Sequence, residues 1–303
     1  MTALIVAGAA AIAAAPARAE GATREFWVAA VPVTWNMIPN QFDDITGTRF
    51  QPAQTVMGTV VYRRFTPHWR RALPNTPTGG NQNLIPGPLL RARVGDRILV
   101  HFKNLDFARR SPHSMHFHGV HYRPSSDGAF VPGISGRDAD VKPGQTWTYQ
   151  LTAGADSAGA WPYHDHSPSM HDSIDGGMYG MLSILGRHEP PPDREFVVVF
   201  ARMGDFQTID GRAFVGNTPV FRSRVGDLVQ WDVMAMGSEH HSFHVHGHRW
   251  LTASGASADT QTVGPAESFR FRWREQDPGT WLYHCHVEEH MALGMIGTYQ
   301  VRR

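Results

Sequence analysis

The chain has 303 residues and a net charge of +1, from 28 Lys and Arg against 27 Asp and Glu. Its adjacent basic pairs, such as Arg63–Arg64 and Arg109–Arg110, are short and well separated. None of them makes a track for phosphates, so we expect no nucleic-acid partner. A single cysteine excludes an internal disulfide, so the cysteine count does not itself establish an oxidising compartment.

Residues 1–19 form an apolar, alanine-rich run that ends with the small residues Ala17 and Ala19 around an arginine. This small-x-small pattern predicts a cleavage site, and residues 1–19 are expected to be a secretory signal peptide, although a basic start is missing. The apolar stretch from Ala3 to Ala15 is too short to span a bilayer, so no membrane anchor is expected. The mature protein is then expected in the periplasm or outside the cell.

Two similar halves follow the leader. The matching segments are 88–96 with 219–227, and 159–166 with 279–286. Such an internal repeat predicts two homologous domains, and roughly 280 residues are enough for both. Consecutive prolines, which continue neither sheet nor helix, mark the junction. The expected parts are domain 1 at 24–187, a linker at 188–193 and domain 2 at 194–303.

The local pattern in both halves is that of β-strands. Short runs rich in Val, Phe, Trp and Tyr, such as 196–200 and 268–273, alternate with glycine and proline turns. Long amphipathic helices are absent from the predicted elements. The pattern is typical of β-sandwiches and predicts an all-β fold class.

Domain 1 carries two pairs of histidines with one residue between the partners, His116–His118 and His164–His166. On a β-strand, residues two apart lie on one face and roughly 6.5 to 7 Å apart along it. Each pair could therefore serve neighbouring metal ions. One such pair is weak evidence, but the same spacing occurs twice more in domain 2.

Domain 2 places the only cysteine, Cys285, between His284 and His286, with His290 and Met295 downstream. A thiolate, imidazoles and a weak axial thioether are the ligands of a blue-copper electron-transfer centre. If the tripeptide is a strand, alternation sends Cys285 to one face and both histidines to the other. One tripeptide can then connect two metal centres. Upstream, three further imidazoles occur within six residues, at His241, His244 and His246.

Comparison of the two copies predicts that only domain 2 holds a blue-copper site. Domain 1 has Asp165 at the position of Cys285 and Met170 at the position of His290. His113 and Met178 align with His241 and Met295 of domain 2, but they lack the sulfur partner. We interpret them as vestiges or ordinary packing residues.

In these motifs and their order the chain resembles the multicopper oxidases, and in particular the two-domain or small laccase branch with the type 1 copper in domain 2 alone. The resemblance covers nearly the whole mature sequence and includes all four histidine motifs of the family. It implies two tandem cupredoxin-like Greek-key β-sandwiches and four copper ions per chain: one type 1, one type 2 and two type 3.

The resemblance also implies a ligand set, position by position. The implied type 1 ligands are His241, Cys285, His290 and Met295. The implied type 2 ligands are His116 and His244, and those of the type 3 pair are His118, His164, His166, His246, His284 and His286.

The implied activity couples one-electron oxidation of small phenols or aromatic amines to the reduction of dioxygen to water. His290 is the expected point of electron entry, and Cys285 passes electrons to the cluster. Asp127 is expected to orient or protonate the oxygen species during reduction, and Tyr122 to donate an electron or a hydrogen bond. A turn-capping aspartate and a packed tyrosine are the alternatives. We expect four further histidines to be supporting or surface residues: His121, His171, His240 and His248.

Four cluster ligands come from each domain, so the cluster is expected at a domain interface. In two-domain laccases that interface joins neighbouring subunits, so the resemblance implies a homotrimer, for which cyclic closure is physically reasonable.

Two other functions stay open, a metal-ion oxidase and a protein that only binds copper or transfers electrons, whereas a nitrite reductase is disfavoured. A metal-ion oxidase of cuprous, ferrous or manganous ions would need an acidic or methionine-rich patch near His290, and Glu288 and Glu289 lie there. A copper-binding or electron-transfer protein would not need eight clustered histidines. A nitrite reductase would have its blue-copper cysteine in domain 1, where Asp165 stands.

Overall fold

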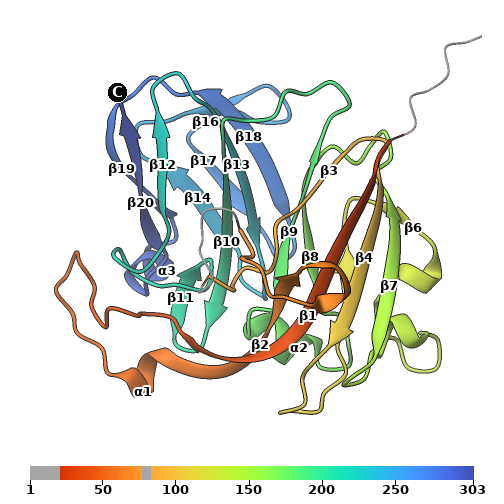
Figure 1. Ribbon diagram of the computed structural model, residues 1–303. Helices are drawn as coiled ribbons and strands as arrows, with labels where there is room; N and C mark the ends of the chain where they lie inside the picture. The colour runs from red at the N-terminus through yellow and green to blue at the C-terminus, as the bar shows by residue number, and fades with distance from the viewer. Residues whose placement is uncertain (1–20, 77–82) are drawn as a thin grey trace, which may run out of the picture.

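A computed structural model describes residues 21–76 and 83–303, and the expected signal peptide at 1–19 lies outside the described residues. The described chain is built mainly from β-strands, which form two β-sandwiches next to each other (Figure 1). We call β1 to β9 the N-terminal sandwich and β10 to β20 the C-terminal sandwich. The all-β fold class expected from the sequence is confirmed.

The N-terminal sandwich packs a five-stranded sheet against a four-stranded sheet. Its core is a cluster of buried apolar side chains contributed by both sheets. The first sheet has the order β2 (Val56–Phe65), β1 (Thr23–Asn36), β4 (Arg97–Asn104), β7 (Thr146–Thr152) and β6 (His121–Tyr122). The second has the order β3 (Leu90–Arg93), β9 (Tyr179–Leu185), β8 (Gly159–His164) and β5 (His116–Phe117).

The C-terminal sandwich repeats this plan around the buried indole of Trp231. Its first sheet has the order β11 (Phe206–Ile209), β10 (Arg194–Met203), β13 (Leu228–Ala235) and β18 (Ser268–Arg274). Its second has the order β12 (Val220–Arg224), β20 (Ile296–Arg302), β19 (Gly279–Cys285), β14 (His241–Val245) and β17 (Thr260–Val263). A separate ribbon pairs β15 (Trp250–Leu251) with β16 (Ser257–Ala258).

Helices of the described chain are short. The α-helices are α1 (Pro52–Thr55), α2 (Met170–Asp175) and α3 (Glu288–Ala292). The 3-10 turns are η1 (Pro67–Trp69), η2 (Pro124–Ser126) and η3 (Arg137–Ala139). They connect strands, and α3 carries one of the expected metal ligands, His290.

Strand register shows that the sequence repeat is also a structural repeat. In both sandwiches the first long strand runs parallel to a central strand, β1 with β4 and β10 with β13. The histidine strands also pair alike, since His116 lies opposite His164 and His244 lies opposite His284. Equivalent backbone positions can therefore be compared between the two halves.

The two sandwiches are joined by buried contacts. The Arg270 guanidinium of β18 forms a buried ion pair with Asp232 at 2.7 Å and donates to the Ile184 carbonyl oxygen of β9 at 2.8 Å. The last residues of β1 reach the C-terminal sandwich, where the indole N–H of Trp35 donates to the carbonyl oxygen of Gly211 at 2.6 Å. The chain then continues below that sandwich towards α1 (Figure 1). The charged pair and the backbone carbonyls are satisfied, which limits the cost of burying them.

Candidate metal centres

Three of the expected type 1 ligands converge in the C-terminal sandwich. The Cys285 Sγ lies 3.8 Å from the His241 Nδ1 and 3.7 Å from the His290 Nδ1, and the two nitrogens are 3.1 Å apart. The cysteine ends β19, His241 begins β14, and His290 lies in α3. Donor atoms from three separate elements thus face one small volume, as a metal site requires.

The surroundings of this group suit copper. Burial, and then the neighbouring His290, lower the pKa of His241 to about 4, so its ring is neutral at neutral pH and keeps a lone pair for a metal. Burial raises the pKa of the Cys285 thiol. A bound cation would favour the thiolate and offset that cost. The fourth expected ligand, Met295, is fully buried, and its carbonyl oxygen accepts from the Cys285 N–H at 3.1 Å.

The outer edge of His290 is held by a carboxylate that the sequence analysis did not identify. The Glu239 Oε2 lies 3.2 Å from the His290 Nε2, and the Glu239 Oε1 lies 3.5 Å from an Arg202 guanidinium nitrogen. The Gln207 amide also donates to Glu239. The only signal in the sequence was an acid two residues before the expected ligand His241.

The eight other expected ligands form two groups of four imidazoles with closely similar geometry. In each group the ring centroids of five of the six pairs lie between 5.1 and 5.7 Å apart. The N-terminal group is His116, His118, His164 and His166. The C-terminal group is His244, His246, His284 and His286.

Hydrogen bonds fix the rings so that the Nε2 atoms are left for a metal. In the N-terminal group the Nδ1 of His116 lies 2.7 Å from the Asp127 carbonyl oxygen, and the Nδ1 of His164 lies 3.0 Å from the Asp165 carbonyl oxygen. The C-terminal group repeats both contacts, His244 with Asp259 at 2.6 Å and His284 with Cys285 at 2.9 Å. A carbonyl oxygen can only accept a hydrogen bond, so each of these rings carries a proton on Nδ1, and in the neutral ring the Nε2 keeps its lone pair.

The Nε2 atoms of neighbouring rings point at each other at very short range. Those of His118 and His164 are 3.2 Å apart, and those of His246 and His284 are 3.1 Å apart. Burial and nearby imidazoles lower the pKa of His118, His164 and His284 to about 4. Neutral rings with converging lone pairs are the donor set that copper prefers.

A glycine after each His-x-His motif makes the arrangement possible. Gly119 and Gly247 have φ of +70° and +71°, a conformation that other residues rarely adopt. A Cβ on Gly119 would lie 2.0 Å from the Trp161 ring, and one on Gly247 would lie 2.8 Å from the Trp281 ring. Both tryptophans are therefore packed directly on the turn that follows the expected ligands.

The tripeptide 284–286 connects the two kinds of site. Cys285 is fully buried and faces His241 and His290. The rings of His284 and His286 lie 5.5 Å apart in the C-terminal four-histidine group. The alternation predicted from the sequence thus places the sulfur on one side of the backbone at the end of β19 and the two imidazoles on the other, with each histidine directly adjacent to Cys285 in the chain.

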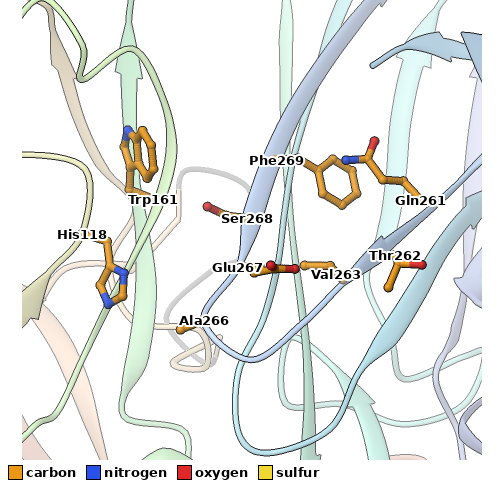
Figure 2. A pocket seen from close by; sticks show the side chains of 9 residues that line it. All are labelled: His118, Trp161, Gln261, Thr262, Val263, Ala266, Glu267, Ser268 and Phe269. Atoms are coloured by element: carbon orange, nitrogen blue, oxygen red, sulfur yellow. The ribbon is translucent and has the colours of Figure 1, made fainter. Parts of the chain in front are cut away.

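Within the described part of the chain, no group of close donor atoms combines imidazoles from both sandwiches. His118 instead faces a cavity of about 350 Å³ whose other wall is formed by β17, β18 and the turn between them (Figure 2). That wall carries Glu267 and Phe269 but no histidine. One chain therefore presents two separate groups of four histidines, each with half of the expected cluster ligands. We call these two groups the N-terminal and the C-terminal half-set.

Asp127 and Tyr122 lie beside the N-terminal group. The Asp127 Oδ1 is 3.5 Å from the His116 Nδ1, and the Tyr122 ring lies 6.2 Å from the His116 ring. Partial burial, followed by the charge of Asp127 and its hydrogen bond, raises the pKa of Tyr122 to about 12. The phenol therefore keeps its proton at neutral pH, and the Asp127 side chain is 40% exposed.

The four histidines expected to be supporting or surface residues fall into two kinds, exposed and buried, and His240 is exposed. His121 and His171 are exposed and face Asp156 and Asp175. His248 is buried and lies 3.2 Å from Glu275, whose two oxygens also accept from the Trp273 indole, the Gln276 backbone N–H and the Tyr299 hydroxyl. Burial opposes ionisation of Glu275, but the hydrogen bonds from His248 and Tyr299 outweigh it and lower its pKa to about 2.

Two models of the multicopper oxidase family match the chain, over residues 69–189 and 188–303. The chain belongs to the multicopper oxidase family, as the sequence motifs predicted. Among curated proteins it is 30% identical to mouse ferroxidase HEPHL1 over 92% of this chain and 29% of that protein. It is 27% identical to human ceruloplasmin, over 92% of this chain and 30% of that protein. The chain thus spans about three tenths of the length of these relatives.

Solved structures show the same architecture. A crystal structure of a multicopper oxidase has a TM-score of 0.70 and 26% identity, and the alignment covers 92% of this chain and 89% of that one. A copper nitrite reductase from Nitrosomonas europaea has a TM-score of 0.69 and 19% identity, covering 93% and 94% of the two chains. The expected cupredoxin-like fold is confirmed. Among residues 21–76 and 83–303, no helix is both long and apolar enough to cross a membrane.

Proposed function

We propose that the protein is a laccase-like oxidase that takes single electrons from phenols or aromatic amines and uses four of them to reduce dioxygen to water. The observation that carries the proposal is the position of Cys285 between the His241–His290 pair and the four-histidine group. Copper would supply one-electron redox chemistry at these residues. Its proposed complement is one type 1, one type 2 and two type 3 ions per chain, held by the ligands named above.

The surroundings of His290 favour an aromatic donor. Val287, Met291 and Leu293 are more than a third exposed around the helix that carries His290. The nearby Glu239 carboxylate already contacts His290, Arg202 and Gln207. An apolar rim whose carboxylate at His290 is already engaged suits a neutral ring better than a metal cation, which needs several free oxygen ligands.

Oxidation of a phenol to a phenoxyl radical releases one electron and one proton. The electron enters through the His290 ring, and Glu239 accepts the proton because its carboxylate lies at the outer nitrogen of that ring. Four such electrons and four protons convert one dioxygen into two waters. Asp127, next to His116, is placed to pass protons from solvent to that reduction.

Metal-ion oxidation is the second candidate, because the curated relatives include ferroxidases. In this chain Glu239, Glu288 and Glu289 would be the carboxylates available to a ferrous or cuprous ion near His290. A nitrite reductase is not favoured, since Asp165 stands in the N-terminal sandwich at the position of Cys285.

Glu239→Gln is expected to lower kcat/KM for a phenol by about 100-fold, because the amide cannot accept the proton. Ferrocyanide, which gives up an electron without a proton, should be oxidised at nearly the wild-type rate. Glu289→Gln, in the exposed first turn of α3, is the matched control. Stopped-flow rates with phenol, ferrocyanide and ferrous ion measure the effect. Equal losses on phenol and ferrocyanide would contradict the proton-acceptor role, and a selective loss on ferrous ion would establish the metal-ion oxidase.

Asp127→Asn is expected to slow dioxygen reduction by about 100-fold while copper content stays unchanged, because the carbonyl oxygen that holds His116 is retained and only the proton donor is lost. Oxygen uptake with saturating donor, together with metal analysis, tests this. Asp156→Asn, which removes an exposed carboxylate paired with His121, is the control. Full turnover in Asp127→Asn with intact copper would remove the proton relay.

We further propose a homotrimer in which the N-terminal four-histidine group of one subunit faces the C-terminal group of the next. The two half-sets in one chain support this, because neither has enough imidazoles for a cluster of three ions. Domain boundaries at 24–187 and 194–303 and a periplasmic or extracellular location belong to the same proposal.

A further inference from the structure

Asp165 and His113 occupy, in the N-terminal sandwich, the backbone positions of two type 1 ligands. Equivalent hydrogen bonds establish this correspondence. The backbone N–H of Asp165 donates to the Met178 carbonyl at 3.0 Å, as that of Cys285 donates to Met295 at 3.1 Å. The backbone N–H of Ser114 donates to the Asp165 Oδ1 at 2.8 Å, as that of Ser242 donates to the Cys285 Sγ at 3.4 Å.

In the N-terminal sandwich the side chains at this position contact one another directly. The His113 Nδ1 lies 3.1 Å from the Asp165 Oδ2, and the His113 Nε2 lies 3.2 Å from the Asp106 Oδ2. Both carboxylates are fully buried, and His113 is 2% exposed. A neutral imidazole has one N–H, so a ring with a carboxylate at each nitrogen is held as the imidazolium. We call these three residues the buried triad.

Asp106 has no counterpart in the C-terminal sandwich. The preceding residues match in register, since Leu105 donates to the Ala30 carbonyl and Met236 donates to that of Phe200. The residue after Met236 is Gly237, which offers no side chain. The His241 Nε2 is accordingly buried without a hydrogen-bond partner in the described chain. Relative to the C-terminal sandwich, Asp165 thus stands in place of Cys285, and Asp106 in place of Gly237. The protonated ring of His113 stands in place of the expected metal ligand His241.

The buried triad is connected to three expected cluster ligands. The Asp165 carbonyl oxygen accepts from the His164 Nδ1 at 3.0 Å. The Ser114 hydroxyl donates to the Asp165 Oδ1 at 3.3 Å and accepts from the His166 backbone N–H at 3.1 Å. Ser114 also lies two residues before His116. The segment before β5 and the end of β8 are therefore joined through this carboxylate.

We propose that the buried triad is a metal-free substitute for a type 1 centre, and that Asp106, His113 and Asp165 position the N-terminal half of the copper cluster. In the C-terminal sandwich a copper ion would join β14, β19 and α3, whereas here charge-assisted hydrogen bonds join the segment before β5, the end of β8 and the loop after β4.

Asp106→Asn tests this role, since Asp106 lies away from all expected ligands in sequence and makes none of their hydrogen bonds. Loss of an outer partner is expected to weaken copper reloading of the cluster roughly 10- to 100-fold. The type 2 spin-resonance signal and the near-ultraviolet band of the type 3 pair should fall, while the blue band from Cys285 remains. Asp96→Asn, which removes a buried carboxylate paired with Arg24, should leave all three unchanged.

The double variant Asp106→Asn, Asp165→Asn removes both charges together, so His113 can be neutral and no buried charge is left unpaired. It should fold, as judged by circular dichroism and the blue band, yet show the same cluster defect after copper titration. Full type 2 and type 3 signals in either variant would overturn the positioning role. Because the cluster itself belongs to the function proposed above, wild-type protein is measured alongside. Absence of cluster signals in the wild type would refute that function, whereas their presence in wild type and variants alike refutes only the buried triad.

Discussion

Cys285→Ser is expected to abolish the blue absorption band and to reduce oxidation of every electron donor to background. Cys285 contacts the outer histidine pair through its sulfur and is joined through its backbone to His284 and His286, and a serine hydroxyl offers no soft ligand to copper. The loss should exceed the roughly 10- to 100-fold cost of removing a mere outer partner of a metal site. Steady-state oxygen uptake with a phenol and with ferrocyanide measures it.

Met295→Leu is the control for this variant, because the axial thioether is the weakest of the four expected ligands. It should keep a blue band and most of the activity. In Cys285→Ser the type 2 spin-resonance signal should also persist, since the expected type 2 ligands His116 and His244 are anchored by backbone carbonyls that serine does not remove. Undiminished aerobic turnover without the sulfur would contradict the proposed electron path.

Two inactive variants are expected to restore each other's activity when they are co-expressed. His164→Ala breaks the N-terminal half-set, and His244→Ala breaks the C-terminal half-set. Each alone should retain its blue band but reduce no dioxygen. In a ring of three subunits with random assembly, about a quarter of the joints would combine two intact halves, so about a quarter of wild-type oxygen uptake should return.

A matched pair that breaks the same half twice, His164→Ala with His116→Ala, should show no recovery. Oxygen uptake per blue centre is the readout, and light scattering of the mixed sample gives the assembly mass. Recovery in the first pair and not in the second would place the cluster between chains. Absence of recovery in a mixed trimer would show instead that each chain builds its own cluster and would contradict the proposed arrangement.

Much of the fold was predictable because it repeats. Alternating strands, glycine and proline turns and duplicated segments predicted two β-sandwiches, and the structure has them. The close approach of the expected ligands was also predictable, because residues two apart in a strand share a face whatever the surroundings. This is why Cys285 and its neighbouring histidines point to opposite sides of the backbone at the end of β19.

Residues that act across loops could not be found this way. Glu239 contacts His290 although 50 positions separate them, and Asp106 contacts His113 from the loop after β4. An isolated aspartate or glutamate in a turn has no periodicity to distinguish it from a solvated one. The interpretation of His113 as a vestige or a packing residue illustrates the limit, since its carboxylate partners are adjacent only once β4, β5 and β8 are assembled.

The sequence by itself thus determined the family, the strand pattern and which side chains could be metal ligands, because these follow from short spacings along one chain. Tertiary structure decided what surrounds each ligand: the carboxylate at the outer edge of His290, the ion triad that closes the N-terminal position, and the separation of the two four-histidine groups. The physical reason is that hydrogen bonds and charge pairs act over about 3 Å, and only folding brings residues from distant loops within that distance.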